Sequence, residues 1–156
     1  METQEELRSL LGRFPSGVAV VTVDSGGQRV GLTVGTLVGL SLEPPLVGFS
    51  VARQAALHEL LREAGLCAVS LLAAGQEELA EHFARGVPPI GMWHGIATEP
   101  STGPPRLSGA VGWLECAVQG EVAAGTHTLF VCAVERAVPG AEGHGLVRVR
   151  GRFTQA

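Results

Sequence analysis

The stretch from Gly31 to Val51 reads GLTVGTLVGLSLEPPLVGFSV and contributes most to the fold prediction. Its Val, Leu and Phe residues predict strands over residues 38–42 and 46–51, because such side chains suit a half-buried pleated surface. Pro44 and Pro45 stand between the two strands, and a residue without an N–H group ends the pairing of a sheet. The stretch therefore predicts two successive buried strands.

Small and hydroxylated residues interrupt the apolar pattern just before these strands, at Thr33, Gly35 and Thr36. A β-bulge at Gly35 would explain them. A backbone that approaches a flat ligand closely, with amide and hydroxyl donors free to bind it, would explain them equally well. The residues alone favour neither account.

Upstream, the chain predicts a helix over residues 3–12 and a strand over residues 17–24, followed by a glycine turn and a second strand from about residue 29. Thr3 and Glu6 have the spacing of a capping box at the start of the helix. The helix has an apolar face of three leucines: Leu7, Leu10 and Leu11.

Downstream, apolar periodicity predicts helices over residues 54–63 and 75–85, and Gly65 is expected to end the first of them. The remaining strands are expected over residues 66–72, 112–122, 128–138 and 146–153. Residues 86–109 hold five prolines and five glycines, which indicates a long loop within one domain.

The order of these elements favours a mainly β fold with peripheral helices. Strands outnumber helices and arrive in consecutive runs joined by short turns, so parallel βαβ winding is not expected. We expect an antiparallel barrel with helices packed outside it, formed by residues 1–156 as a single domain. A chain of this length buries roughly two-thirds of its unfolded surface in one core.

The composition excludes several classes of function. The chain has no Lys, Asn or Tyr, and Asp24 is its only Asp. Without Lys, Schiff-base chemistry and a Walker-A nucleotide site are excluded. The net charge of −4 with interspersed Arg and Glu provides no basic stripe for nucleic acid. No apolar run approaches the ~20 residues of a membrane-spanning helix, and the polar start predicts no secretion signal.

The cysteines and histidines give no sign of a metal centre. Cys67, Cys116 and Cys132 lie in apolar stretches and are expected to be buried, reduced thiols of a cytoplasmic protein. No Cys or His pair has metal-binding spacing. His58 and His82 fall on expected helices and are interpreted as surface or rim residues.

Two catalytic motifs are incomplete. The run GFSVA, residues 48–52, lacks the last glycine of a GxSxG nucleophile elbow. A Ser-His-Asp triad would have to use Asp24, which precedes that serine in the chain. No GxGxxG follows a strand, so a Rossmann dinucleotide site is not expected.

Taken together, several segments resemble the flavin reductase-like family of FMN-binding split β-barrels. The signature is GLTVGT, residues 31–36, followed by SLEPPLV, residues 41–47. The other matching segments are RFPSGVAVVT (13–22), LHELL (57–61), QEELAEHF (76–83), WLEC (113–116), GTHTLFV (125–131) and RGRF (150–153). They follow the order of the family over nearly the whole chain.

The resemblance implies an antiparallel split β-barrel that forms a homodimer. It also implies an NAD(P)H-dependent flavin reductase, which transfers a hydride from reduced nicotinamide to FMN or FAD. Family members often supply reduced flavin to a monooxygenase component. This chemistry needs no acid–base triad, because the flavin accepts the hydride directly.

The same resemblance implies a set of site residues. Thr33, Val34, Gly35 and Thr36 would line the isoalloxazine ring and ribityl chain. Ser50, Val51 and Arg53 would follow the chain toward the phosphate, and Phe83 and Arg85 would close the site. His127, Arg148 and Arg150 would lie on the nicotinamide side. His127 would be the catalytic residue, holding the nicotinamide; its alternative interpretation is a histidine in a turn between strands.

The chain departs from the family where Ser or Thr residues commonly bind the flavin phosphate, because Ala55 and Ala56 stand there. Each lost hydroxyl-to-phosphate bond is expected to weaken binding by roughly 1.5–3 kcal/mol. That would suit a reductase that releases its flavin, and it would equally suit a degenerate site.

Three alternatives to a reductase therefore stay open. They are a non-catalytic flavin- or ligand-binding split barrel, a purely structural dimer, and an oxidase resembling the pyridoxamine-phosphate oxidases. The preference between FMN and FAD, that between NADH and NADPH, and the identity of any monooxygenase partner are also left open.

Overall fold

The computed structural model describes residues 1–85 and 88–156. Its elements in chain order are α1 (Glu2–Arg13), β1 (Ser16–Gly17), β2 (Ala19–Ser25), β3 (Gln28–Val34), β4 (Val38–Leu42), β5 (Pro45–Ala52), α2 (Ala56–Ala64), β6 (Leu66–Leu71), α3 (Glu77–Ala84), the 3-10 turn η1 (Pro89–Gly91), β7 (Gly112–Ala124), β8 (His127–Pro139), β9 (Leu146–Val149) and β10 (Arg152–Gln155).

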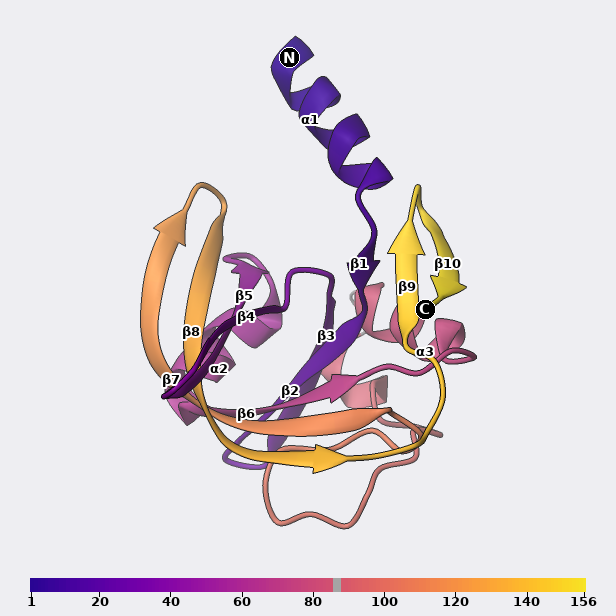
Figure 1. The fold of residues 1–156 in the computed structure, drawn as a ribbon. Coiled ribbons are helices and arrows are strands. Elements are labelled where there is room, and N and C mark those ends of the chain that lie inside the picture. The colour runs from indigo at the N-terminus through magenta and orange to yellow at the C-terminus, as the bar shows by residue number, and fades with distance from the viewer. Residues whose placement is uncertain (86–87) are drawn as a thin grey trace.

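A seven-stranded antiparallel sheet forms the body of the molecule, in the order β3-β2-β6-β7-β8-β5-β4. A small sheet, in the order β1-β9-β10, stands beside it. Strands β7 and β8 bend strongly from the base of the molecule up one side (Figure 1). Their pairing shifts register between Glu115 and Cys116 and again between Val118 and Gly120. Such bulges bend and twist a strand, which allows the sheet to curl into a barrel.

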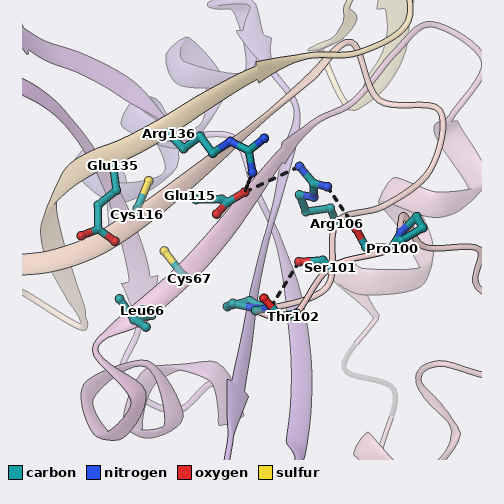
Figure 2. A pocket seen from close by; sticks show the side chains of 12 residues that line it. Leu66, Cys67, Pro100, Ser101, Thr102, Arg106, Glu115, Cys116, Glu135 and Arg136 are labelled. Atoms are coloured by element: carbon teal, nitrogen blue, oxygen red, sulfur yellow. Dashed lines mark hydrogen bonds and ion pairs between the residues drawn. The ribbon is translucent and has the colours of Figure 1, made fainter.

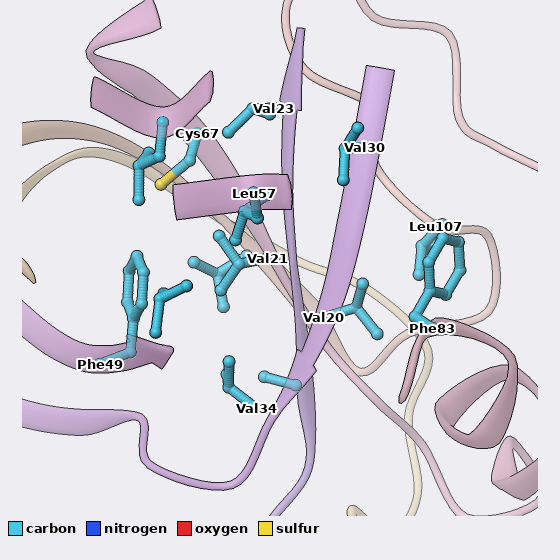
Figure 3. Close-up of a cluster of buried hydrophobic side chains, with 14 of the residues drawn as sticks. Val20, Val21, Val23, Val30, Val34, Phe49, Leu57, Cys67, Phe83 and Leu107 are labelled. Atoms are coloured by element: carbon cyan, nitrogen blue, oxygen red, sulfur yellow. The ribbon is translucent and has the colours of Figure 1, made fainter. Parts of the chain in front are cut away.

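The core fills the inside of this curled sheet. Strand β2 contributes Val20, Val21 and Val23, all fully buried, and the rings of Phe49 and Phe130 lie 6.2 Å apart. Figure 3 shows Val21, Leu57 and Phe49 turned toward one another. Burying a side chain of this size contributes roughly 1.5–3 kcal/mol, so this cluster accounts for much of the stability.

Helices α2 and α3 pack on the barrel as expected. Helix α2 buries Leu57 and Leu61, and it ends at Gly65 in the left-handed conformation, with φ +69°. Helix α3 buries Ala80 and Phe83. The predicted end of α2 is therefore confirmed.

The segment after α3 covers the free edge of strand β3. The backbone N–H of Gly31 donates to the sulfur of Met92 at 3.2 Å, and the indole N–H of Trp93 donates to the carbonyl of Arg29 at 2.9 Å. An uncovered edge would offer unpaired backbone groups to another strand. The expected loop over residues 86–109 thus has a structural role, and its residues 86 and 87 lie outside the described residues.

The predicted limits of two strands are wrong. The strand expected over residues 17–24 is divided at Val18, because β1 pairs with β9 in the small sheet whereas β2 belongs to the barrel. The strand expected over residues 146–153 is a hairpin of β9 and β10. Arg150 and Gly151 form its turn with φ values of +53° and +72°, and this pair of positive values suits the twist of a two-residue hairpin.

The expectations for the first helix are partly wrong. Helix α1 begins at Glu2, so Thr3 lies inside it and does not cap it. Its apolar face does not pack on the barrel, since Leu7, Leu10 and Leu11 are 55–59% exposed. Figure 1 shows α1 extending away from the rest of the chain.

None of the helices within the described ranges is long and apolar enough to span a membrane.

Candidate functional site

The loop between β3 and β4 is tied to β5 at Thr36. The backbone N–H of Ser50 donates to the Thr36 hydroxyl at 2.9 Å. Two residues expected to follow a flavin are thereby adjacent, although they are 14 positions apart in the chain. The bond holds the loop against the sheet and fixes where its backbone lies.

Gly35 brings this loop close to the small sheet. A Cβ atom at Gly35 would lie 3.0 Å from the hydroxyl of Ser16, so a larger residue would push the two apart. Ser16 is the cross-strand partner of Arg148. The Arg148 guanidinium packs over the ring of Phe153 at 5.4 Å and is otherwise exposed. The glycine therefore allows Ser16, the cross-strand partner of the expected nicotinamide-side arginine, to approach the expected flavin loop.

Arg53 and His127 also lie together. The Arg53 backbone N–H donates to the carbonyl of Thr126 at 3.1 Å, and its guanidinium donates to the carbonyl of His127 at 3.5 Å. His127 begins β8, is exposed, and has its Nδ1 atom 2.9 Å from the Thr126 hydroxyl. The turn between β7 and β8 is thus attached to the connection between β5 and α2, with its imidazole open to solvent.

The buried His58 also connects this region, because it joins α2 to β8 by a hydrogen bond. Nδ1 of His58 hydrogen-bonds the carboxylate of Glu59, and its Nε2 lies 2.7 Å from the hydroxyl of Thr128. A carboxylate only accepts, so Nδ1 of His58 is the donor to Glu59, and Nε2 shares a hydrogen bond with the Thr128 hydroxyl. The hydrogen bond from His58 lowers the pKa of Glu59, with a smaller contribution from Arg62. His58 is only 2% exposed, so its interpretation as a surface or rim residue is wrong.

A cavity of about 280 Å³ lies in front of the N-terminus of α2. Phe83 and Gly31 line one side of it, and Ala55 and Ala56 line another. The first N–H groups of a helix have no partner within it and attract an anion. Ala55 is the N-cap, and its side chain offers no hydroxyl to compete for these groups or to assist them.

Of the twelve expected site residues, only Phe83 lines this cavity. Gly35, Thr36, Ser50, Arg53, His127 and Arg148 lie in the connected loops and strands described above, and Val51 is buried in the core. The other four are placed elsewhere. The Thr33 hydroxyl donates to the carbonyl of Ala80 at 2.6 Å, and Val34 is 5% exposed and part of the core. Arg85 lines a separate cavity beside His82. Arg150 forms the turn of the β9–β10 hairpin, where its N–H donates to the carbonyl of Gly12.

Sequence reasoning did not identify three residues that shape the cavity: Gly31, Pro89 and Met92. The segment 31–36 was singled out for its hydroxyls, whereas Gly31 matters because a Cβ atom there would lie 2.8 Å from the ring of Phe83. Pro89 and Met92 belong to the expected loop, whose proline content was their only signal. Among the residues that the structure describes, no group of His, Cys, Asp and Glu is arranged to hold a metal ion.

Comparison with known proteins decides the family. A family model for the flavin reductase like domain matches residues 11–156. The chain belongs to the flavin reductase-like family. The split barrel predicted from the sequence resemblance is confirmed by its structural neighbours.

Curated relatives and a solved structure agree with this membership. An NADH-dependent FAD reductase of Streptomyces globisporus is 39% identical over 95% of this chain and 83% of its own length. The reductase component of a 4-hydroxyphenylacetate 3-monooxygenase of Thermus thermophilus is 40% identical over 92% of this chain and 91% of its own. The structure of a Streptomyces globisporus NADH:FAD oxidoreductase with NAD and FAD fragments superposes with a TM-score of 0.91 at 35% identity, covering 98% of this chain and 92% of that one.

Some of the described residues suit a flavin, whereas the side chains at the phosphate end offer it no hydroxyl group. Backbone N–H groups at the start of α2 suit a phosphate, and Phe83 offers an apolar wall for a flat ring. The exposed Arg53 provides a cation nearby. Ala55 and Ala56 have no hydroxyl groups. At the start of α2, only main-chain N–H groups are therefore available to a flavin phosphate.

Proposed function

We propose that residues 1–156 act as one flavin reductase domain, which transfers a hydride from reduced nicotinamide to FMN or FAD. The observation that carries the proposal is the attachment of Arg53 to His127 directly beside the open N-terminus of α2. This arrangement places an anion-binding element and a solvent-open imidazole next to each other. Membership of the flavin reductase-like family supports the same reaction.

The flavin is the acceptor substrate, and its ring system accepts the hydride without help from an acid–base triad. The protein has to hold the ring, exclude water and orient the donor. Backbone groups around Gly35, Thr36 and Ser50 would contact the ring and its chain. Phe83 would pack against the flavin, and the start of α2 would hold the phosphate.

The nicotinamide would enter from the side of His127 and Arg148. His127 is exposed at the first position of β8, and its backbone carbonyl is held by Arg53. Its imidazole would donate to the nicotinamide amide and fix the orientation of the ring. Arg148 would meet a phosphate of the dinucleotide, because its guanidinium is exposed.

The homodimer belongs to the proposal as well. Helix α1 exposes Leu7, Leu10 and Leu11, and Phe14 just beyond it is 74% exposed. An apolar stripe of this size on an isolated element indicates a partner surface. A second copy of the chain would cover it.

A partner enzyme and a cellular location complete the proposal. The Thermus thermophilus relative is named as the reductase component of a monooxygenase, and this chain would likewise supply reduced flavin to a monooxygenase. Cys67, Cys116 and Cys132 are free thiols, which favours a reducing cytoplasm.

A second candidate function is a flavin carrier without reductase activity. It is favoured by Ala55 and Ala56, which offer no hydroxyl to a flavin phosphate. The two functions differ in one property, since a carrier binds flavin and does not oxidise a reduced nicotinamide.

Two substitutions test the assignment of the site. Replacing His127→Ala is expected to slow nicotinamide oxidation more than it weakens flavin binding, and an unchanged rate would remove His127 from the mechanism. Replacing Thr36→Leu is expected to abolish flavin binding. Thr154→Leu, at an exposed position on β10, is the matched control. Equal flavin affinity in both threonine variants would show that the site is misplaced.

A further inference from the structure

A second cavity is separate from the proposed flavin site. It measures about 530 Å³ and lies between residues 100–106 and strands β6, β7 and β8. Figure 2 shows Arg106, Glu115 and Arg136 gathered at this cavity, with Glu135 set apart from them. None of the residues assigned to flavin or nicotinamide lines it. Its volume lies in the range of roughly 300–1,000 Å³ that small-molecule sites occupy.

A β-bulge places two charged side chains in this cavity. Glu115 pairs with Arg136, whereas the next residue, Cys116, pairs with Val134, so Glu135 has no partner in the register of β7. Successive side chains of a regular strand point to opposite faces. Because of the bulge, Glu135 and Arg136 both line the cavity.

Two guanidinium groups share one carboxylate on one side of the cavity. Oε2 of Glu115 lies 3.6 Å from Nη1 of Arg106 and 3.5 Å from Nη1 of Arg136. Two cations and one anion leave this cluster with one uncompensated positive charge. It is therefore the side of the cavity where a carboxylate would bind.

Arg106 is held in place, but only some of its N–H groups have hydrogen-bond partners. Its side chain is 13% exposed, its guanidinium lies 5.4 Å from the centre of the Trp113 ring, and its Nη2 donates to the carbonyl of Pro100 at 3.2 Å. Its Nε and Nη1 atoms are buried and have no hydrogen-bond partner among the described residues. An unsatisfied buried guanidinium is costly, and a bound anion would lower that cost through its charge rather than by a hydrogen bond to these two buried atoms.

Glu135 supplies a negative charge on the side of the cavity away from the arginine cluster. It is exposed, and within residues 1–85 and 88–156 it takes part in no ion pair. A purely anionic ligand would be repelled by Glu135, and a purely cationic one by the arginine cluster. A ligand with both charges would satisfy both sides, while Leu66, Pro100 and Pro104 provide an apolar wall.

We propose that this cavity binds a small zwitterion of the class of free α-amino acids. Its carboxylate would lie at Arg106 and Arg136, its ammonium group at Glu135, and its side chain against Leu66 and Pro104. The site is independent of the proposed flavin reduction.

The cavity is a binding site rather than a place of covalent chemistry. Cys67 and Cys116 also line it and are cross-strand partners. Contacts with the thiols of Cys116 and Cys132, together with burial, raise the pKa of Cys67 well above its usual range. A protonated, buried thiol is a poor nucleophile, so it would not react with a bound ligand.

Calorimetric titration of the flavin-free full-length protein with three matched probes tests the proposal. L-phenylalanine carries both charges, 3-phenylpropanoate only the carboxylate, and 2-phenylethylamine only the ammonium group. The variants are Glu135→Gln and Arg136→Gln, both at exposed positions that the fold tolerates. Arg29→Gln, which loses an ion pair with Asp24 elsewhere on the surface, is the control.

L-phenylalanine is expected to bind wild type and the Arg29→Gln control about five- to tenfold more tightly than either single-charge probe. Glu135→Gln should remove its advantage over 3-phenylpropanoate, and Arg136→Gln should weaken both carboxylate-bearing probes. The proposal is overturned if L-phenylalanine does not bind, if 3-phenylpropanoate binds as tightly, or if both cavity variants bind like wild type. None of these outcomes depends on whether the protein reduces flavin.

Discussion

The imidazole of His58 lies 2.7 Å from the hydroxyl of Thr128 and joins the first turn of α2 to the start of β8. Both side chains are buried, and 70 positions separate them in the chain. The residue before Thr128 is His127, and the residues before α2 include Arg53. One buried hydrogen bond therefore fixes the distance between the proposed phosphate and nicotinamide elements of the site.

Loss of the Thr128 hydroxyl is expected to destabilise the protein. Thr128→Val keeps the shape of the side chain but leaves Nε2 of His58 buried without a hydrogen-bond partner, which costs about 1–3 kcal/mol. Urea unfolding measures this cost. Thr154→Val, at an exposed strand position, is the control. Equal unfolding free energies for the two variants would mean that the hydrogen bond contributes nothing.

The hydrogen bond between His58 and Glu59 makes stability depend on acid pH. The folded protein lowers the pKa of Glu59, so the unfolded chain binds a proton more readily. The stabilisation is present above the unfolded pKa, at roughly pH 4–5, and is lost as the pH falls through the folded value. The stability difference between wild type and Glu59→Gln is therefore expected to be constant near neutral pH and to shrink in acid. A difference that does not change with pH would contradict this account.

A methyl group at Gly31 is expected to disturb the flavin cavity. The Cβ atom of Gly31→Ala would lie 2.8 and 2.9 Å from two ring carbons of Phe83, so the ring or the strand has to move. Overpacking of this kind costs typically 1–3 kcal/mol. FMN affinity and the melting temperature should both fall. Gly39→Ala, whose Cβ would meet no atom within 4 Å, should leave both unchanged. Similar behaviour of the two variants would refute the role of Phe83 as a cavity wall.

The exposed face of α1 is expected to hold the dimer together. Leu10→Glu places a charge on this face, and because Leu10 is 59% exposed in the single chain, the barrel should still fold. Light scattering after gel filtration should show wild type as a dimer and the variant shifted toward the monomer. The control is Gln4→Glu, at an exposed position of the same helix. A dimeric Leu10→Glu variant would place the interface elsewhere.

Local patterns predicted most of the elements, because strand and helix formation depends on residues close in sequence. Gly65 as the end of α2 is one example, since a left-handed cap needs a glycine there. The hairpin turn at Arg150 was missed because an arginine rarely adopts a positive φ. The burial of His58 could not be seen either, since its partner Thr128 is brought to it only by the closed barrel.

The site was predicted less completely than the fold. Resemblance to the family indicated the loop of Gly35 and Thr36, and the structure brings Thr36 to Ser50. Thr33 has the same chemistry in sequence, yet its hydroxyl is bound by the carbonyl of Ala80. Whether a hydroxyl is free for a ligand depends on the packing of α3, which no local pattern contains. The charged cavity at Glu135 has the same origin, because it depends on a bulge between two distant strands.

The central claim is tested most directly by titrating the purified protein with FMN without oxygen and then adding NADH and, separately, NADPH. Absorbance of the flavin follows both steps. The account predicts that the protein binds oxidised FMN and that its absorbance near the visible maximum is bleached promptly by at least one of the two nucleotides. Bound FMN that neither nucleotide bleaches would contradict the reductase and favour the carrier. Absence of FMN binding, with the same result for FAD, would mean that Ala55 and Ala56 mark a lost site.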